Sequence, residues 1–143
     1  MATSTTSMIF KQDPQSNVSL FINEGICEAT FLLWDSNDNE VADYNGKLVF
    51  NDCWAAEFSC LEVSPYSLTS DQCIPGIFLT QLSDAEWYAN KVRDKVTLYP
   101  DWQIWDKRAY IHYLLMGRDN YVQIIASGFK FEIIPFERRV IAK

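Results

Sequence analysis

The order of apolar and polar residues along the chain predicts mainly short β-strands. Runs rich in β-branched and aromatic side chains cover residues 18–22, 26–34 and 77–82, and each run is bounded by residues that favour turns. Asn23-Glu24-Gly25 separates the first two runs and favours a turn. Residues 35–39 are all polar and form a predicted loop after the second run.

Apolar and polar positions also alternate between residues 53 and 60. Alternation with a period of two is typical of a strand that has one face in the core and one face toward water. The polar face would carry Glu57 and Ser59. The inward face would carry Trp54, Ala56, Phe58 and Cys60.

The dipeptide Asn45-Gly46 is the strongest local turn signal in the chain. Both residues tolerate the positive φ angles that the two central positions of a type I′ turn require. Apolar residues flank the dipeptide on both sides. We therefore predict a hairpin in which residues 41–44 pair with residues 47–50.

The last third of the chain predicts a second hairpin. Residues 108–116 and 121–127 form its two arms, and Gly117-Arg118-Asp119-Asn120 forms its turn. The apolar positions then change phase by one residue at Ser127-Gly128. Such a change of phase indicates a β-bulge or a tight bend at that point.

One segment predicts a helix, over about residues 84–95. Ser83 and Glu86 have the spacing of a capping box, which satisfies free N–H groups at a helix start. An apolar stripe follows at helical spacing. If the stripe through Ala85 faces the core, Trp87 lies about 200° around the helix, at roughly 100° per residue, and points away from the core. The stripe consists of Ala85, Tyr88, Ala89, Val92 and Val96.

These elements predict a mainly β fold, either all-β or α+β. We expect a curved antiparallel sheet, a sandwich or a partly open barrel of about six to eight strands with one α-helix. The 143 residues have the length of a single domain, in which residues 1–6 would be a frayed polar tail.

Charge and hydropathy narrow the classes of partner. The chain has 12 basic and 19 acidic residues, and its net charge of −7 argues against binding to a phosphate backbone. No window approaches the roughly 18 apolar residues of a transmembrane helix, and the start lacks the features of a secretory signal. We therefore expect a cytoplasmic protein without nucleic-acid or membrane partners, in which the four cysteines are free, buried thiols.

No motif predicts catalysis, a metal or a cofactor. The single histidine, His112, has no acidic residue two positions away, and the cysteines form no Cys-x-x-Cys pair. Residues 35–39 begin like a calcium loop, but Glu40 and Gly46 stand where the loop needs glycine and glutamate. The five glycines are isolated, so a phosphate-binding loop is not expected.

Aromatic residues on and after the predicted helix are the candidate interaction site. Trp and Tyr offer large apolar faces with polar tips at low entropic cost, and they are frequent anchors of interfaces. In the alternative, Trp87 packs beneath the connection at 97–106 while Trp102 and Trp105 close one end of the sheet. The candidate partner-binding or ligand-binding residues are Trp87, Tyr99, Asp101, Trp102 and Trp105.

Three functions fit these observations. The first is a small non-enzymatic protein-interaction module, such as an accessory subunit, inhibitor or immunity-type protein, whose acidic surface would favour a basic protein partner. The second is a β-barrel or sandwich that binds a small ligand in its interior. The third is an enzyme that uses dispersed residues such as His112, a cysteine and carboxylates.

Overall fold

A computed structural model describes residues 10–60, 72–83 and 85–135. Nine strands and two helices lie in these ranges, which confirms the prediction of a mainly β fold. The predicted tail at residues 1–6 lies outside the described residues. The strands are β1 (Phe10–Gln12), β2 (Ser19–Asn23), β3 (Ile26–Asp35), β4 (Glu40–Asn51), β5 (Ala55–Ser59), β6 (Leu79–Leu82), β7 (Ile111–Met116), β8 (Tyr121–Ala126) and β9 (Gly128–Pro135).

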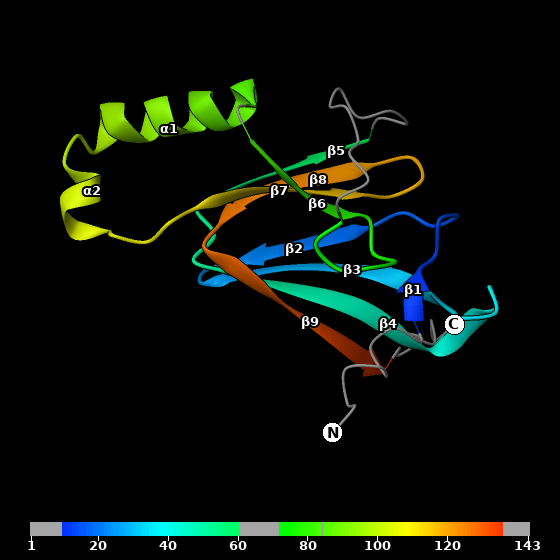
Figure 1. Ribbon diagram of the computed structural model, residues 1–143. Coiled ribbons are helices and arrows are strands. Elements are labelled where there is room, and N and C mark those ends of the chain that lie inside the picture. The colour runs from blue at the N-terminus through cyan, green and yellow to red at the C-terminus, as the bar shows by residue number, and fades with distance from the viewer. Residues whose placement is uncertain (1–9, 61–71, 84, 136–143) are drawn as a thin grey trace, which may run out of the picture.

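The strands form two antiparallel sheets (Figure 1). The first has the order β1-β3-β4-β9, and β2 pairs with β3 as well. The second has the order β5-β8-β7-β6. The predicted hairpin of β7 with β8 is confirmed by the pair Met116↔Tyr121. The turn predicted at Asn23-Glu24-Gly25 lies between β2 and β3, which pair with each other at Asn23↔Ile26.

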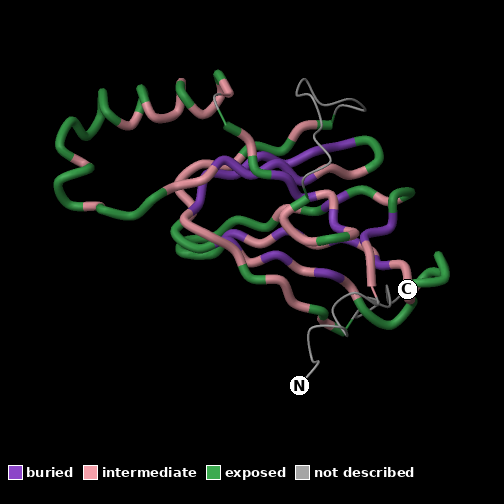
Figure 2. The backbone as a smooth tube through the Cα atoms, viewed as in Figure 1, coloured by how far each residue is buried: buried purple, intermediate pink, exposed green. Residues whose placement is uncertain are grey.

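The hydrophobic core lies between the two sheets. Figure 2 shows the buried residues concentrated on strands of both sheets, whereas the helices carry none. Alternate residues of each strand contribute, as the period of two requires. The core includes Ala29, Phe31, Leu33, Leu48 and Phe50 from the first sheet, and Leu79, Tyr113, Leu115, Val122, Ile124 and Ala126 from the second.

The chain passes between the sheets at two adjacent corners. One corner joins β4 to β5 through Asp52, whose φ is 54°, and the other joins β8 to β9 through Ser127. The Ser127 N–H donates to the carbonyl of Asn51 over 2.8 Å, which ties the two corners together. The predicted change of phase at Ser127-Gly128 is therefore the bend at which the strand leaves one sheet for the other.

The predicted type I′ turn at Asn45-Gly46 is wrong. Both residues lie inside β4, where Gly46 pairs with Phe31 on one side and with Ile133 on the other. A Cβ at Gly46 would lie 2.4 Å from Cε1 of Phe31. Glycine is thus required at position 46 because a ring from the neighbouring strand covers the backbone. The requirement does not come from a turn.

The predicted inward face of β5 is only partly correct. Phe58 pairs with Val122 and so shares the face of β8 that lines the core, yet 45% of Phe58 is exposed and Cys60 is also exposed. β5 is the outermost strand of its sheet in the order β5-β8-β7-β6. Alternation marks the two faces of a strand, but at the edge of a sheet the inner face is not fully covered.

The predicted helix is α1, which spans Glu86–Leu98, and a short helix α2 (Trp102–Trp105) follows within the predicted connection. The capping box is wrong, because the N-cap residue is Ala85 and no side chain caps the helix. Figure 1 shows α1 on the outer side of the second sheet, with α2 beyond the strand ends. Neither helix is long and apolar enough to cross a membrane, as far as the described residues extend.

Candidate functional site

Four of the five predicted site residues gather where α1 meets α2. Tyr99, Asp101 and Trp105 are exposed, and Trp102 is half-buried. They line a surface groove of about 510 Å³ that opens around the junction of the two helices. The groove is completed by Lys95, Leu98, Pro100 and Asp106.

Trp87 lies apart from this groove, against the outer face of the second sheet. Its ring centroid is 4.9 Å from that of His112 on β7, and its indole nitrogen is buried. The apolar stripe predicted that Trp87 points away from the core, and this is wrong because Trp87 packs on the sheet. The face of α1 that meets the sheet also carries Lys91 and Lys95, whose ammonium groups lie over aromatic rings.

Three aromatic rings from three segments form a cage beneath the second half of α1. Trp54 follows the β4–β5 corner, Trp102 begins α2, and Tyr110 precedes β7. The ring centroids of each pair lie 6.1–6.4 Å apart, with interplanar angles between 50° and 89°. We call these three residues the aromatic cage.

The ammonium group of Lys95 occupies the aromatic cage. Its Nζ lies 4.2 Å from the ring centroid of Trp54, 4.5 Å from that of Trp102 and 5.4 Å from that of Tyr110. All three distances are within the roughly 6 Å at which a ring attracts a cation. Burial lowers the pKa of Lys95, while the negative charge of Asp106 acts in the opposite direction.

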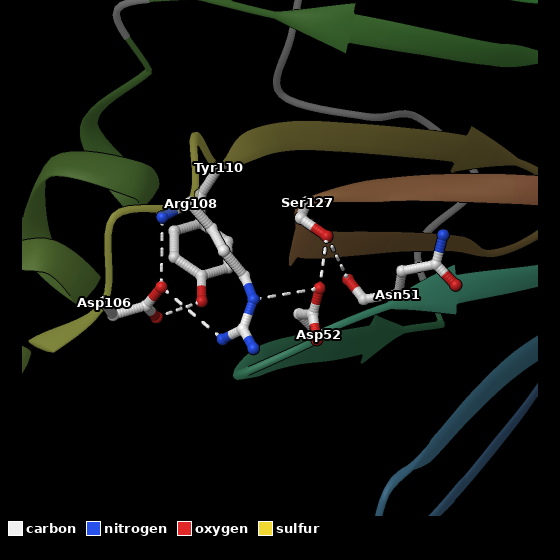
Figure 3. A network of polar contacts seen from close by, with 6 residues as sticks. All are labelled: Asn51, Asp52, Asp106, Arg108, Tyr110 and Ser127. Carbon is white, nitrogen blue, oxygen red and sulfur yellow. Dashed lines mark hydrogen bonds and ion pairs between the residues drawn. The ribbon is translucent and has the colours of Figure 1, made fainter.

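A chain of polar contacts holds Tyr110 in place (Figure 3). The Tyr110 hydroxyl donates to Asp106, whose pKa is lowered chiefly by this hydrogen bond. The Arg108 guanidinium lies 3.4 Å from Asp106 and 3.4 Å from Asp52 at the β4–β5 corner. The Ser127 hydroxyl in turn donates to Asp52 over 2.6 Å. The cage is therefore anchored to the place where the chain passes between the sheets.

A second surface groove, also of about 510 Å³, adjoins the first. Both grooves are lined by Lys95, Leu98 and Tyr99. The second groove reaches Trp54, whereas the first reaches Trp102, so each gives access to one wall of the cage. Lys95 thus belongs both to the shared border of the two grooves and to the cage.

His112 is buried on the outer face of the second sheet, beneath α1. Its Nε2 lies 3.0 Å from Oε1 of Gln123, which can only accept, and Gln123 Nε2 donates to Glu57 over 2.8 Å. Burial lowers the pKa of His112, and the hydrogen bond with Gln123 opposes this. His112 thus contacts an amide, and the carboxylate of Glu57 lies beyond that amide.

No cluster of three or more His, Cys, Asp or Glu suited to a metal ion occurs within the described ranges. The polar loop at residues 35–39 has a structural role instead. The Asp35 carboxylate accepts hydrogen bonds from the N–H groups of Asn37 and Asn39, and Lys11 forms an ion pair with Asp38. These contacts close the turn between β3 and β4.

Sequence patterns did not identify Trp54, Tyr110 or Lys95 as site residues. The available signal was the spacing of Trp87, Lys91 and Lys95, which recur every four residues and so share one face of a helix. The apolar stripe identified only part of the inward face: Tyr88 lies over His112, whereas Ala89 and Val96 are exposed. The stripe leaves out Lys91 and Lys95 because it counts lysine as outward-facing. The other two walls of the cage come from distant segments that only the fold brings together.

Comparison of the chain with protein-family models, with curated proteins and with solved structures found no match.

Proposed function

We propose that this protein is a non-enzymatic protein-interaction module that binds a basic segment of a partner protein at the junction of α1 and α2. One observation carries the proposal. Four large apolar side chains are exposed within eight residues of this junction, and we call them the elbow patch. They are Leu98, Tyr99, Ile104 and Trp105, with exposed fractions of 71%, 64%, 62% and 84%.

Contiguous exposed apolar surface is uncommon on proteins that act alone, and it marks surfaces that are covered on binding. Tyr99 and Trp105 are of the residue types that anchor interfaces. Asp101 and Asp106 line the same groove, and the chain as a whole carries a net charge of −7. Positively charged residues in the partner would therefore be steered toward this groove.

A cytoplasmic location is part of this proposal. The four cysteines at positions 27, 53, 60 and 73 are all free, but only Cys27 is buried, so the prediction that all four are buried is wrong. Free thiols are usual in reducing compartments, where disulfides are rare. Roles as an accessory subunit, an inhibitor or an immunity-type protein all fit such a module.

The alternative of a small ligand inside the β structure has less support. The space between the sheets is occupied by side chains without exposed surface, such as Leu33, Leu48 and Leu115. The enzymatic alternative is also weaker, since His112 is buried beneath α1 and lines neither of the two grooves at Lys95.

Site-specific photo-crosslinking in the native host tests the proposal. A photoreactive residue at Gln103, which is exposed on α2, should capture one specific protein. The same residue at Glu24, in the turn between β2 and β3, serves as the control and should not capture it. Capture at both positions, or at neither, would contradict the proposal.

Purified partner then allows a quantitative test. Trp105→Ser should weaken the Kd by about thirtyfold or more, which corresponds to the roughly 2 kcal/mol of an interface hot spot. Phe21→Ser is the matched control, because Phe21 is also an exposed aromatic residue but lies on β2. Equal effects of the two substitutions would show that the elbow patch is not the binding surface.

A further inference from the structure

We propose that the aromatic cage is a binding site for an N-methylated lysine of the partner protein, and that Lys95 is an internal occupant which this lysine displaces. The inference rests on the proposed function and names the chemistry that the partner presents. Its first support is the cage itself, in which the faces of Trp54, Trp102 and Tyr110 surround a single ammonium group. Enclosure of a cation by several aromatic faces is the arrangement that recognises alkylammonium ligands.

The second support is the way in which Lys95 is held. No carboxylate lies within ion-pair distance of its Nζ among the residues that the structure describes. Asp106 acts on it only through a longer-range charge interaction, because this carboxylate binds Tyr110 and Arg108. The rings are therefore the main contacts of the ammonium, and Lys95 can leave without breaking an ion pair.

The third support is access. The two grooves share Lys95, Leu98 and Tyr99, and one reaches Trp102 while the other reaches Trp54, so withdrawal of the Lys95 side chain would open the cage toward both grooves. Two residues of the elbow patch, Leu98 and Tyr99, line both grooves. A partner segment that lies along the elbow patch would thus carry a lysine directly over the cage.

Competition with Lys95 determines which ammonium can bind. An internal group has an effective concentration of millimolar order, so an unmodified lysine from outside gains nothing by replacing Lys95. A trimethylated lysine keeps the positive charge but loses little hydration on entering the cage, and its methyl groups fill the space between the rings. The internal occupant therefore makes the cage selective for the methylated form.

The test uses the purified full chain and tetramethylammonium chloride as the probe, followed by the NMR signals of the tryptophan indole N–H groups. Lys95→Gln removes the ammonium group from the cage and keeps a residue that favours a helix. Lys95→Ala removes most of the side chain as well and leaves more space between the rings. We expect both variants to bind tetramethylammonium with shifts at Trp54 and Trp102, and the original protein to bind at least about tenfold more weakly because of internal competition. Sodium chloride at equal ionic strength should cause no such shifts.

Two matched variants separate the cage from general effects. Lys91→Ala removes a lysine from the same face of α1, but its Nζ lies over Trp87 outside the cage, so tetramethylammonium binding should stay as weak as in the original protein. Trp102→Leu combined with Lys95→Gln should abolish binding. Equal binding by the original protein and both Lys95 variants, or shifts confined to Trp87, would overturn the proposal.

A last comparison identifies the source of the cation. An N-acetyl, N-methylamide derivative of trimethyllysine should bind the Lys95→Gln protein more tightly than choline does, because its backbone amides contact the adjoining grooves. Tighter binding of choline would assign the cage to a free metabolite and overturn the proposal. If the cage does not bind tetramethylammonium, the crosslink at Gln103 should still form. If the protein has no partner at the elbow patch, that crosslink should be absent, but the Lys95 variants should still bind tetramethylammonium.

Discussion

The side-chain amide of Asn120 forms hydrogen bonds with both backbone polar groups of Val18. Its Oδ1 accepts from the Val18 N–H over 3.1 Å, and its Nδ2 donates to the Val18 carbonyl over 2.8 Å. Both bonds are buried, and they join the turn between β7 and β8 to the start of β2. The side-chain amide of Asn120 thus supplies the hydrogen-bond partners that a neighbouring strand would otherwise give to the N–H and carbonyl of Val18.

Asn120→Ala should therefore lower the free energy of unfolding by about 3 kcal/mol, because each buried backbone group without a partner costs roughly 1–3 kcal/mol. Urea denaturation followed by circular dichroism measures the change. Asn17→Ala is the control, since Asn17 accepts one exposed hydrogen bond from the Asp119 N–H, and its effect should stay within about 0.5 kcal/mol. Equal losses in the two variants would show that the contacts with Val18 do not stabilise the fold.

Gly46→Ala should destabilise the protein by about 2 kcal/mol, because the new methyl group would overlap the ring of Phe31 in a packed sheet. Gly128→Ala is the matched control, since the nearest atom to its Cβ, Nδ2 of Asn51, would be 3.8 Å away. Thermal and urea denaturation of both variants checks this difference. If the ring causes the loss, Phe31→Leu should recover part of it in the Gly46→Ala background, with a coupling free energy of about 1 kcal/mol.

These contacts show which parts of the fold a sequence can predict. Strands β2 and β3 and the turn between them were predicted because the pattern of each run and the trio Asn23-Glu24-Gly25 are local. Asn45-Gly46 has the strongest local turn signal in the chain, but its conformation is decided by Phe31 and by Ile133 on β9, which are distant in sequence. Local signals fail where tertiary packing imposes a different requirement on the same residue.

In the candidate site, too, the residues that are close in sequence were predicted and those brought together by the fold were not. Tyr99, Asp101, Trp102 and Trp105 were predicted because they lie close together in sequence, and they line one groove. The aromatic cage was missed because its walls come from the β4–β5 corner, from α2 and from the segment before β7. A pattern of residue types along the chain carries no information about which of these segments meet.

Stability should decrease as the pH falls from 7 to 5.5, in part through His112. Burial lowers the pKa of this imidazole below its ordinary value of 6.5, so below that pH the unfolded chain takes up a proton that the folded protein excludes. The stabilisation is therefore present above about pH 6.5 and is lost as the pH falls toward the lower folded pKa. Free energies of unfolding measured by urea denaturation at several pH values give the slope.

His112→Phe should reduce this slope, because phenylalanine keeps an aromatic ring beneath Trp87 and Tyr88 but does not titrate. The slope is the diagnostic quantity, since the loss of the hydrogen bond to Gln123 lowers the stability of the variant at every pH. Glu57 is the nearest carboxylate in this hydrogen-bonded chain and remains in both proteins. Identical slopes would mean that His112 does not contribute to the pH dependence.

The four thiols should react with iodoacetamide in an order set by exposure and by pKa. Cys60 is exposed and should react first, whereas Cys27 is buried in the core and should react only on unfolding. Cys53 and Cys73 are both half-buried, but a hydrogen bond with Cys27 lowers the pKa of Cys53, and burial raises the pKa of Cys73. Because the thiolate is the reactive form, Cys53 should react faster than Cys73 at pH 7.5.

Cys27→Ala tests the cause of this order. The same hydrogen bond and burial raise the pKa of Cys27, so Cys27 remains a thiol that can stabilise the Cys53 thiolate. Removal of the Cys27 thiol should slow alkylation of Cys53 and leave Cys60 unchanged, as measured by mass spectrometry of the labelled peptides. Faster labelling of Cys73 than of Cys53 in the original protein, or an unchanged rate at Cys53 in the variant, would show that the contact between the two thiols does not control reactivity.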